Sequence, residues 1–173
     1  MNLEIVIFNQ LHGLIGKSVC FDALAIFFAK DFIWFLAVLS VLIYFLYRHQ
    51  RRPSKIFFLG SGTFILSYIL LLVTQFIYFR PRPFVSLKFD SLINILPQNP
   101  SFPSSHTIFA FVFALVVFFI NKKWGILFLV LASLIGFSRI LVGAHWPSDV
   151  LASILIVILS FYLIKKLLKS MNL

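Results

Sequence analysis

The chain has few charged residues, and acids are the scarcest of them. Only 12% of its 173 residues are charged, with five Asp and Glu against fifteen Lys and Arg. Hydrophobic residues make up 61%, and the mean hydropathy is +1.04. This balance excludes an ordinary soluble globular domain. Because a helix satisfies its own backbone groups in lipid, the sequence predicts an all-α integral membrane protein, a helical bundle.

Cysteine is almost absent as well. The single Cys20 excludes a disulfide within the chain. The first residues, MNLEIVIFNQLHG, lack the basic start and small-residue cleavage site of a secretory signal. No internal repeat or low-complexity tract is present. We therefore expect residues 1–173 to form one membrane-embedded domain.

The formal net charge of +10 has two explanations. A nucleic-acid partner would attract cations, and so would the rule that places Lys and Arg on the cytoplasmic side of membrane helices. The apolar composition favours the second explanation. We expect membrane lipids, and no nucleic acid, as partners.

Five uncharged runs approach the roughly 20 apolar residues that cross a bilayer. We predict transmembrane helices at Phe32–Tyr47, Ile56–Phe79, Thr107–Asn121, Trp124–Ser138 and Val150–Ile164. The first thirty residues differ, because Lys17, Asp22 and Lys30 interrupt every window long enough to span. Their rough apolar stripe predicts amphipathic helices in the outer interface. A sixth, weak span with a cytoplasmic N-terminus is the alternative.

The connecting charges predict the orientation. Lys and Arg gather in residues 48–55, 121–123 and 165–169, which places these three segments in the cytoplasm. The loop of residues 80–106 and the turn before residue 149 then share the extracytoplasmic face. Arginines on that face oppose the charge rule and indicate a local anionic partner.

Two short motifs could hold a phosphate. In FRPRPF (79–84), Arg80 and Arg82 alternate with prolines, and a guanidinium group suits a pair of phosphate oxygens. Taken alone, this motif is as typical of an ordinary helix end as of a phosphate site. In FPSSHT (102–107), Ser104 is a plausible N-cap, so Ser105 and His106 would open a helix whose free amides bind anions. A lone histidine at the end of a membrane helix is more often an interfacial side chain than a catalytic one. The third motif is what favours a catalytic role for His106.

That third motif is SRILVGAHWPSD (138–149). Arg139 ends an apolar run, and His145 and Asp149 stand four residues apart, a spacing that can bring two side chains together. A carboxylate bonded to one ring nitrogen fixes the tautomer and raises the basicity of the other. An activated imidazole, a second histidine and several arginines meet the requirements of phosphoryl transfer.

We expect neither a metal nor another cofactor. A metal-dependent phosphatase needs several carboxylates, yet besides Asp149 the chain has only Glu4, Asp22, Asp31 and Asp90. The arginines are the expected counterions.

These residues resemble the type 2 phosphatidic acid phosphatase superfamily, whose signature is Lys-x6-Arg-Pro, Pro-Ser-Gly-His and Ser-Arg-x5-His-x3-Asp. Here the three parts are QFIYFRPRP (75–83), PSSH (103–106) and SRILVGAHWPSD (138–149). Two positions depart from it, since Gln75 replaces the lysine and Ser105 the glycine. Arg80 is our candidate for the missing cation, and Gln75 would keep a weak polar contact.

The resemblance implies a role for each matching residue. His145 would attack phosphorus to form a phosphohistidine, with Asp149 orienting it. His106 would protonate the leaving group and then activate water. The oxygens would be held by Arg82, Arg139, Ser104 and the amide of Ser105.

Further segments resemble the bacterial undecaprenyl-diphosphatase branch, namely HGL, RPRPFV, ILPQNPSFPSSHT and SRILVGAHWPSDVLAS. That branch removes the terminal phosphate of undecaprenyl diphosphate at the outer face of the plasma membrane, which recycles the cell-wall lipid carrier and confers bacitracin resistance. Phosphatidylglycerophosphate and phosphatidate phosphatases share the three motifs and remain alternatives. A phospholipid-binding transporter or scaffold is a third, although it would not need His145 and Asp149 together. The oligomeric state stays open.

Overall fold

The chain folds into a bundle of helices, in a computed structural model that describes residues 3–49 and 53–171. The described part has no strand. Its helices are α1 (Leu3–His12), α2 (Val19–Lys30), α3 (Phe32–Tyr47), α4 (Pro53–Ile77), α5 (Pro83–Ser86), α6 (Ser105–Ile120), α7 (Lys122–Leu141) and α8 (Pro147–Ser170). The predicted all-α class is thus confirmed.

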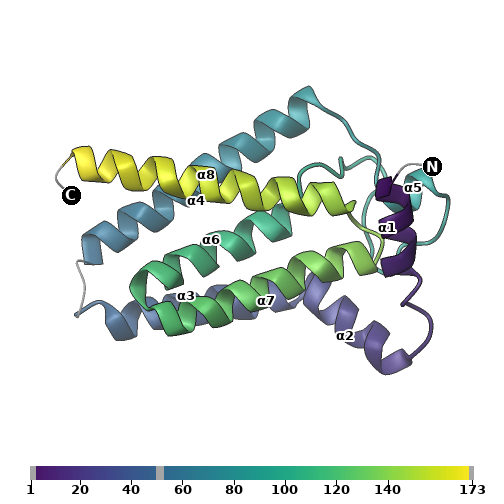
Figure 1. Cartoon of the computed structure of the whole chain (residues 1–173), viewed down its shortest axis with the longest axis horizontal. Helices are drawn as coiled ribbons and strands as arrows, with labels where there is room; N and C mark the ends of the chain where they lie inside the picture. Colours follow the sequence, from purple (N-terminus) through teal and green to yellow (C-terminus); the bar gives the residue numbers. More distant parts are fainter. Residues whose placement is uncertain (1–2, 50–52, 172–173) are drawn as a thin grey trace.

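Helix α6 is the centre of the bundle. Figure 1 shows it flanked by α4 and α8 on one side and by α3 and α7 on the other, and it packs against all four. Ile108, Ala110 and Ala114 along α6 have no exposed surface. The outer faces of the surrounding helices are apolar and exposed, as Trp34 (72%), Phe76 (92%) and Leu155 (67%) illustrate. Apolar groups on both sides of a helix are what a lipid environment requires.

The helices give three or four candidate membrane spans. Helices α4, α7 and α8 are each long and apolar enough to cross a bilayer, and α2 with α3 would form a fourth span bent by 54°. Helix α6, with 16 residues, is shorter than the usual span. Each predicted run coincides largely with one helix, Phe32–Tyr47 has the predicted bounds, and the runs Ile56–Phe79 and Thr107–Asn121 extend two residues and one residue past the ends of α4 and α6. The count of five spans remains a prediction.

A tight hairpin joins α6 to α7. The Oδ1 of Asn121 accepts hydrogen bonds from the backbone N–H groups of Lys123 (3.0 Å) and Trp124 (3.3 Å), so this residue caps the start of α7. Gly125 lets the two helices touch, because a Cβ there would lie 2.1 Å from the Cα of Phe118. The hairpin therefore returns the end of α7 to the end of the bundle where α6 begins.

The N-terminal helices cover that same end (Figure 1). Phe8 of α1 is completely buried and packs on the rings of Phe89 and Trp146. His12 donates through Nδ1 to the main-chain oxygen of Leu141 at 2.7 Å. The first thirty residues thus form two helices, and α1 buries an aromatic ring in the protein; their predicted place in the outer interface remains a prediction. With 10 and 12 residues, neither α1 nor α2 alone has the length of a span.

Candidate active site

The three motifs meet at one end of the bundle, on the right in Figure 1. Helices α6 and α8 begin there and α7 ends there, while α4 leads into the loop that carries α5. Gly143 has a φ of +79°, in the left-handed region that glycine tolerates, and makes the turn between α7 and α8. Pro147 opens α8, as the sequence predicted.

His145 lies in this turn with only 2% of its surface exposed. Its Nδ1 is 2.7 Å from the main-chain oxygen of Ser101, and a carbonyl only accepts, so Nδ1 carries the proton. Its Nε2 faces the Nη1 of Arg82 at 3.3 Å and the Nη2 of Arg139 at 3.4 Å. Guanidinium nitrogens only donate, so Nε2 presents a lone pair to two cations.

Main-chain oxygens hold Arg82 in place. Its Nε donates to Asn99 (3.1 Å), its Nη2 to Pro100 (3.0 Å) and its Nη1 to Ala144 (2.9 Å). Burial lowers the pKa of Arg82 to about 10, which leaves the group charged at neutral pH. Carbonyls orient this cation without neutralising it, so its charge remains available to an anion.

Arg139 supplies the second cation, from the last turn of α7. It is 5% exposed, and its Nη1 donates to the main-chain oxygen of Ala29 in α2 at 2.8 Å. Its Nε is buried and has no hydrogen-bond partner among the described residues. No carboxylate of the described part lies within ion-pair distance of Arg82 or Arg139. Two buried like charges around one nitrogen favour the entry of an anion.

Asp149 stands beside His145 but bonds to other groups. Its Oδ2 is 3.7 Å from the Nδ1 of His145, while it accepts from the backbone N–H of Trp146 (2.8 Å) and the hydroxyl of Ser101. The predicted pairing of His145 with Asp149 is thus present at ion-pair distance, but this contact is longer than a normal hydrogen bond and the closer partners of Asp149 are other groups. The physical reason is that Asp149 occupies the third position of α8 and turns back to cap its start.

Arg80, the candidate for the missing phosphate cation, is bound by other groups in this structure, so its role at the phosphate remains a prediction. Its guanidinium group donates to Asp149 (2.5 Å), Ser148 and Glu4 and lies over the ring of Trp146. Two carboxylates pair with its single positive charge, and no hydrogen bond joins it to the Nε2 of His145. Arg80 therefore belongs to a carboxylate network beside the pocket.

Gln75 stands at the position of the family lysine, and its predicted weak polar contact with the phosphate remains a prediction. It lies half-buried on α4, and among the described residues no hydrogen bond links it to the pocket.

The start of α6 has the predicted form. Ser104 is the N-cap, and its hydroxyl accepts from the Thr107 hydroxyl at 3.0 Å and the Thr107 N–H at 3.5 Å. The N–H of Ser104 donates to the Ser153 hydroxyl at 2.8 Å, which ties α6 to α8. Ser105 and His106 follow in the first turn, where helix amides lack internal acceptors. The ring of His106 lies within the electrostatic reach of Arg82, Arg139 and His145.

Two contributors escaped the sequence prediction. Ser101 stands one residue before the second motif and touches both His145 and Asp149. Glu4 was counted only as a spare acid, yet it binds Arg80 and the N–H of Ser148. Ser101 and Glu4 lie outside the three signature motifs, and no local pattern distinguishes a serine or glutamate that will be placed by tertiary packing.

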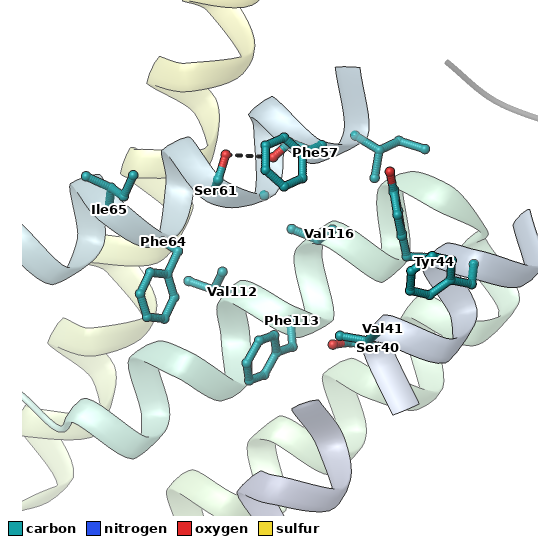
Figure 2. A pocket seen from close by; sticks show the side chains of 13 residues that line it. Ser40, Val41, Tyr44, Phe57, Ser61, Phe64, Ile65, Val112, Phe113 and Val116 are labelled. Atoms are coloured by element: carbon teal, nitrogen blue, oxygen red, sulfur yellow. Dashed lines mark hydrogen bonds between the residues drawn. The ribbon is translucent and has the colours of Figure 1, made fainter. Parts of the chain in front are cut away.

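A separate apolar groove lies among α3, α4 and α6 (Figure 2), towards the opposite end of the bundle from His145. Its volume is about 570 Å3. Aliphatic and aromatic side chains such as Phe64, Val112 and Phe113 line it, and its polar groups are the hydroxyls of Ser40, Tyr44 and Ser61. Without an imidazole, guanidinium or carboxylate in its lining, the groove is not the centre of phosphoryl transfer.

An apolar helical bundle that presents an imidazole lone pair between two guanidinium groups has the parts of a membrane lipid phosphatase. Comparison with known families agrees, because the PAP2 superfamily profile matches residues 55–171. The chain belongs to the PAP2 superfamily, which confirms the resemblance of its three motifs.

Individual relatives support the same class. Undecaprenyl-diphosphatase BcrC of Bacillus subtilis is 33% identical over 165 residues, which cover 94% of this chain and 82% of that protein. An undecaprenyl-diphosphatase of Sulfolobus acidocaldarius is 27% identical over 150 residues, covering 86% and 68%. The crystal structure of Aquifex aeolicus LpxE superposes with a TM-score of 0.77 at 25% identity, over 96% of both chains. The chain is thus a multi-pass membrane protein of the lipid phosphatase class.

Proposed function

We propose that this protein is an undecaprenyl-diphosphate phosphatase that removes the terminal phosphate through a phosphohistidine at position 145. The observation that carries the proposal is the Nε2 of His145, 3.3 Å from Arg82 and 3.4 Å from Arg139. A nucleophile flanked by two cations is what a phosphate dianion requires. Relatives named undecaprenyl-diphosphatase support the choice of substrate.

In the first proposed step, the lone pair of His145 Nε2 attacks the terminal phosphorus. The bond from that phosphorus to the bridging oxygen breaks, and its electron pair leaves with the lipid monophosphate, to which His106 can give a proton. The ring keeps its proton on Nδ1 and so becomes positively charged. The Asp149 carboxylate, 3.7 Å from Nδ1, stabilises that charge.

In the second step, water replaces the histidine. His106 takes a proton from the water as its oxygen attacks phosphorus, and the N–P bond breaks. Inorganic phosphate leaves, and the electron pair returns to Nε2. The hydroxyl of Ser104 and the amide of Ser105 complete the cradle for the phosphate oxygens.

The arginines supply the counter-charge in this proposal, so the reaction needs no metal ion. Arg82 and Arg139 are oriented mainly by backbone carbonyls, which carry no net charge. Their positive charges can therefore stabilise the negative charge on the phosphate oxygens in the transition state.

We place the site at the extracytoplasmic face of a bacterial plasma membrane. The basic residues at the opposite end of the bundle support this orientation under the positive-inside rule; they include Arg48, Lys55, Lys122, Lys123, Lys165, Lys166 and Lys169. Gln98, in the exposed loop before α6, offers a test. A cysteine at this position, with Cys20 replaced by serine, should react with an impermeant thiol reagent applied to intact cells. Labelling only after lysis contradicts the orientation.

The activity itself is tested with purified protein in detergent. Undecaprenyl diphosphate should release phosphate equally with and without a chelator, and His145→Gln should abolish release. Loss of activity with chelator contradicts the metal-free mechanism. Matched diacyl substrates, phosphatidylglycerophosphate and phosphatidate, decide the substrate class, since faster turnover of either contradicts the polyprenyl assignment. Binding without any hydrolysis indicates a transporter or scaffold.

A further inference from the structure

Ser101 is a buried residue that contacts both members of the proposed nucleophilic pair. It has no exposed surface. Its carbonyl oxygen is 2.7 Å from the Nδ1 of His145, and its hydroxyl donates to the Oδ2 of Asp149. Its own N–H donates to the main-chain oxygen of Arg80 at 2.8 Å. Two of these three bonds join the loop before α6 to the turn and first residues of α8, and the third ties the loop to the segment that follows α4.

The carbonyl of Ser101 accepts a hydrogen bond from Nδ1 and so fixes the tautomer of the His145 imidazole. At 3.7 Å the Asp149 carboxylate is too distant for a normal hydrogen bond to Nδ1, whereas the carbonyl at 2.7 Å is within range. A proton held on Nδ1 leaves the lone pair on Nε2, the nitrogen that faces Arg82 and Arg139. If the proton were on Nε2 instead, an N–H would point at two cations and the ring could not attack.

The hydroxyl of Ser101 fixes the position of the Asp149 carboxylate. It donates to the same Oδ2 that accepts from the Trp146 N–H at 2.8 Å, so two donors fix this oxygen beside the ring. There the negative charge is close enough to stabilise a ring that becomes positive when Nε2 is phosphorylated.

From these contacts we propose that Ser101 is a positioning residue of the reaction. Its carbonyl selects the reactive tautomer of His145, and its hydroxyl holds Asp149 where the phosphorylated ring needs it. This inference rests on the proposed function and adds to it a residue that lies outside the three motifs.

A purely structural role for Ser101 predicts a different response to substitution. The site has no exposed surface, so a larger side chain should disturb a packing role more than a smaller one. The positioning role depends instead on the hydroxyl. Ser101→Ala removes the hydroxyl and keeps the volume low, whereas Ser101→Thr keeps the hydroxyl and adds a methyl group. The two roles therefore predict opposite orders of activity.

The experiment measures steady-state release of phosphate from undecaprenyl diphosphate and the rate of phosphoenzyme formation in a single turnover. For Ser101→Ala we expect kcat to fall by about 10- to 100-fold, the loss typical of a removed orienting partner, with little change in KM. Phosphoenzyme formation should slow in parallel. Ser101→Thr should recover most of the activity. If Ser101→Thr is no more active than Ser101→Ala, the proposal is overturned.

Ser160 provides the matched control. It is also a fully buried serine, on α8, and its hydroxyl has no hydrogen-bond partner in the described structure. Ser160→Ala should keep kcat within about twofold, because it breaks no bond. If Ser101→Ala fails to fold, Ser101→Cys, a weaker donor of similar shape, takes its place and should likewise be less active than Ser101→Thr.

The outcomes separate this inference from the proposed function. A wild-type protein that releases no phosphate from undecaprenyl diphosphate rejects the function. An active wild type together with a Ser101→Ala variant as active as Ser160→Ala rejects the positioning role alone.

Discussion

The Nη1 of Arg82 lies 3.3 Å from the Nε2 of His145 and 2.9 Å from the main-chain oxygen of Ala144. One nitrogen of the cation therefore binds both the backbone of the turn and the ring that the turn carries. The cation and the proposed nucleophile are thus held close to each other without substrate, and such preorganisation would lower a barrier that is dominated by charge.

Arg82→Lys should reduce kcat/KM on undecaprenyl diphosphate by about 10²- to 10³-fold, the cost of removing a preorganised donor from a transition state. A lysine cannot reach three carbonyls and a phosphate at once. Arg48→Lys is the control, since Arg48 is exposed at the opposite end of the bundle and should tolerate the change. Equal activities of the two variants would remove Arg82 from the reaction.

His106→Ala should accumulate a phosphoenzyme. The lipid phosphate that leaves in the first step is already a stable anion and needs little help from an acid, whereas the water of the second step needs a base. Protein mixed with substrate labelled in the terminal phosphate should retain acid-labile label in this variant. The exposed His49 gives the control variant His49→Ala. Normal turnover without retained label in His106→Ala would exclude the proposed base.

Acid should destabilise the folded protein through His145. Burial lowers the pKa of His145, in the turn outside the helices, from 6.5 to about 4. Between these values the unfolded chain binds a proton that the folded protein does not, so stability rises with pH through this window and falls as pH drops from 6.5 to 4. The full loss is about 3 kcal/mol.

The comparison of wild type with His145→Gln isolates this contribution. Thermal unfolding in detergent should show a smaller loss of stability in the variant over the same pH range, because glutamine does not titrate. The acid limb of kcat/KM for the wild type should lie below pH 6.5, since the nucleophile stays unprotonated. An acid limb above pH 6.5, or identical acid sensitivity of both proteins, would contradict a buried neutral imidazole.

The sequence predicted the helices and the convergence of the motifs because both depend on local chemistry. Apolar runs define helices in lipid, Ser104 caps the helix that carries His106, and the basic ends of the bundle indicate which loops share a face. The pocket residues Arg82, Arg139 and His145 then meet as expected. Each of these residues stands at or near the end of a predicted helix, so the helix bounds largely determine its position in the bundle.

The same reasoning could not assign partners within the pocket. Spacing alone brings Asp149 within 3.7 Å of His145, but the bond to Nδ1 comes from a backbone carbonyl, which any residue at position 101 supplies. Arg80 was expected at the phosphate because its charge is suitable, yet Glu4, distant in sequence, binds it. Competition among several charges is settled by tertiary packing, which one sequence does not reveal.

The hairpin between α6 and α7 offers a test of the fold that avoids the pocket. Gly125→Ala should destabilise the protein by about 1–3 kcal/mol, the usual cost of overpacking, because its Cβ would meet the Cα of Phe118 at 2.1 Å. Gly60→Ala on α4 should be tolerated, since its Cβ would make an ordinary 3.4 Å contact with Val116. Thermal unfolding of the two variants measures the difference, and equal stabilities would argue against so close an approach of α6 and α7.

Glu4 has a consequence beyond the anchoring of α1. Its carboxylate binds Arg80, Arg80 binds Asp149, and Asp149 stands next to the nucleophilic ring. The first turn of a short peripheral helix is thus separated from His145 by only two side chains, those of Arg80 and Asp149. If His145 is the nucleophile as proposed, the charge of a residue in the N-terminal segment reaches the reacting group through two intervening side chains, so this segment would contribute to the chemistry as well as to the packing.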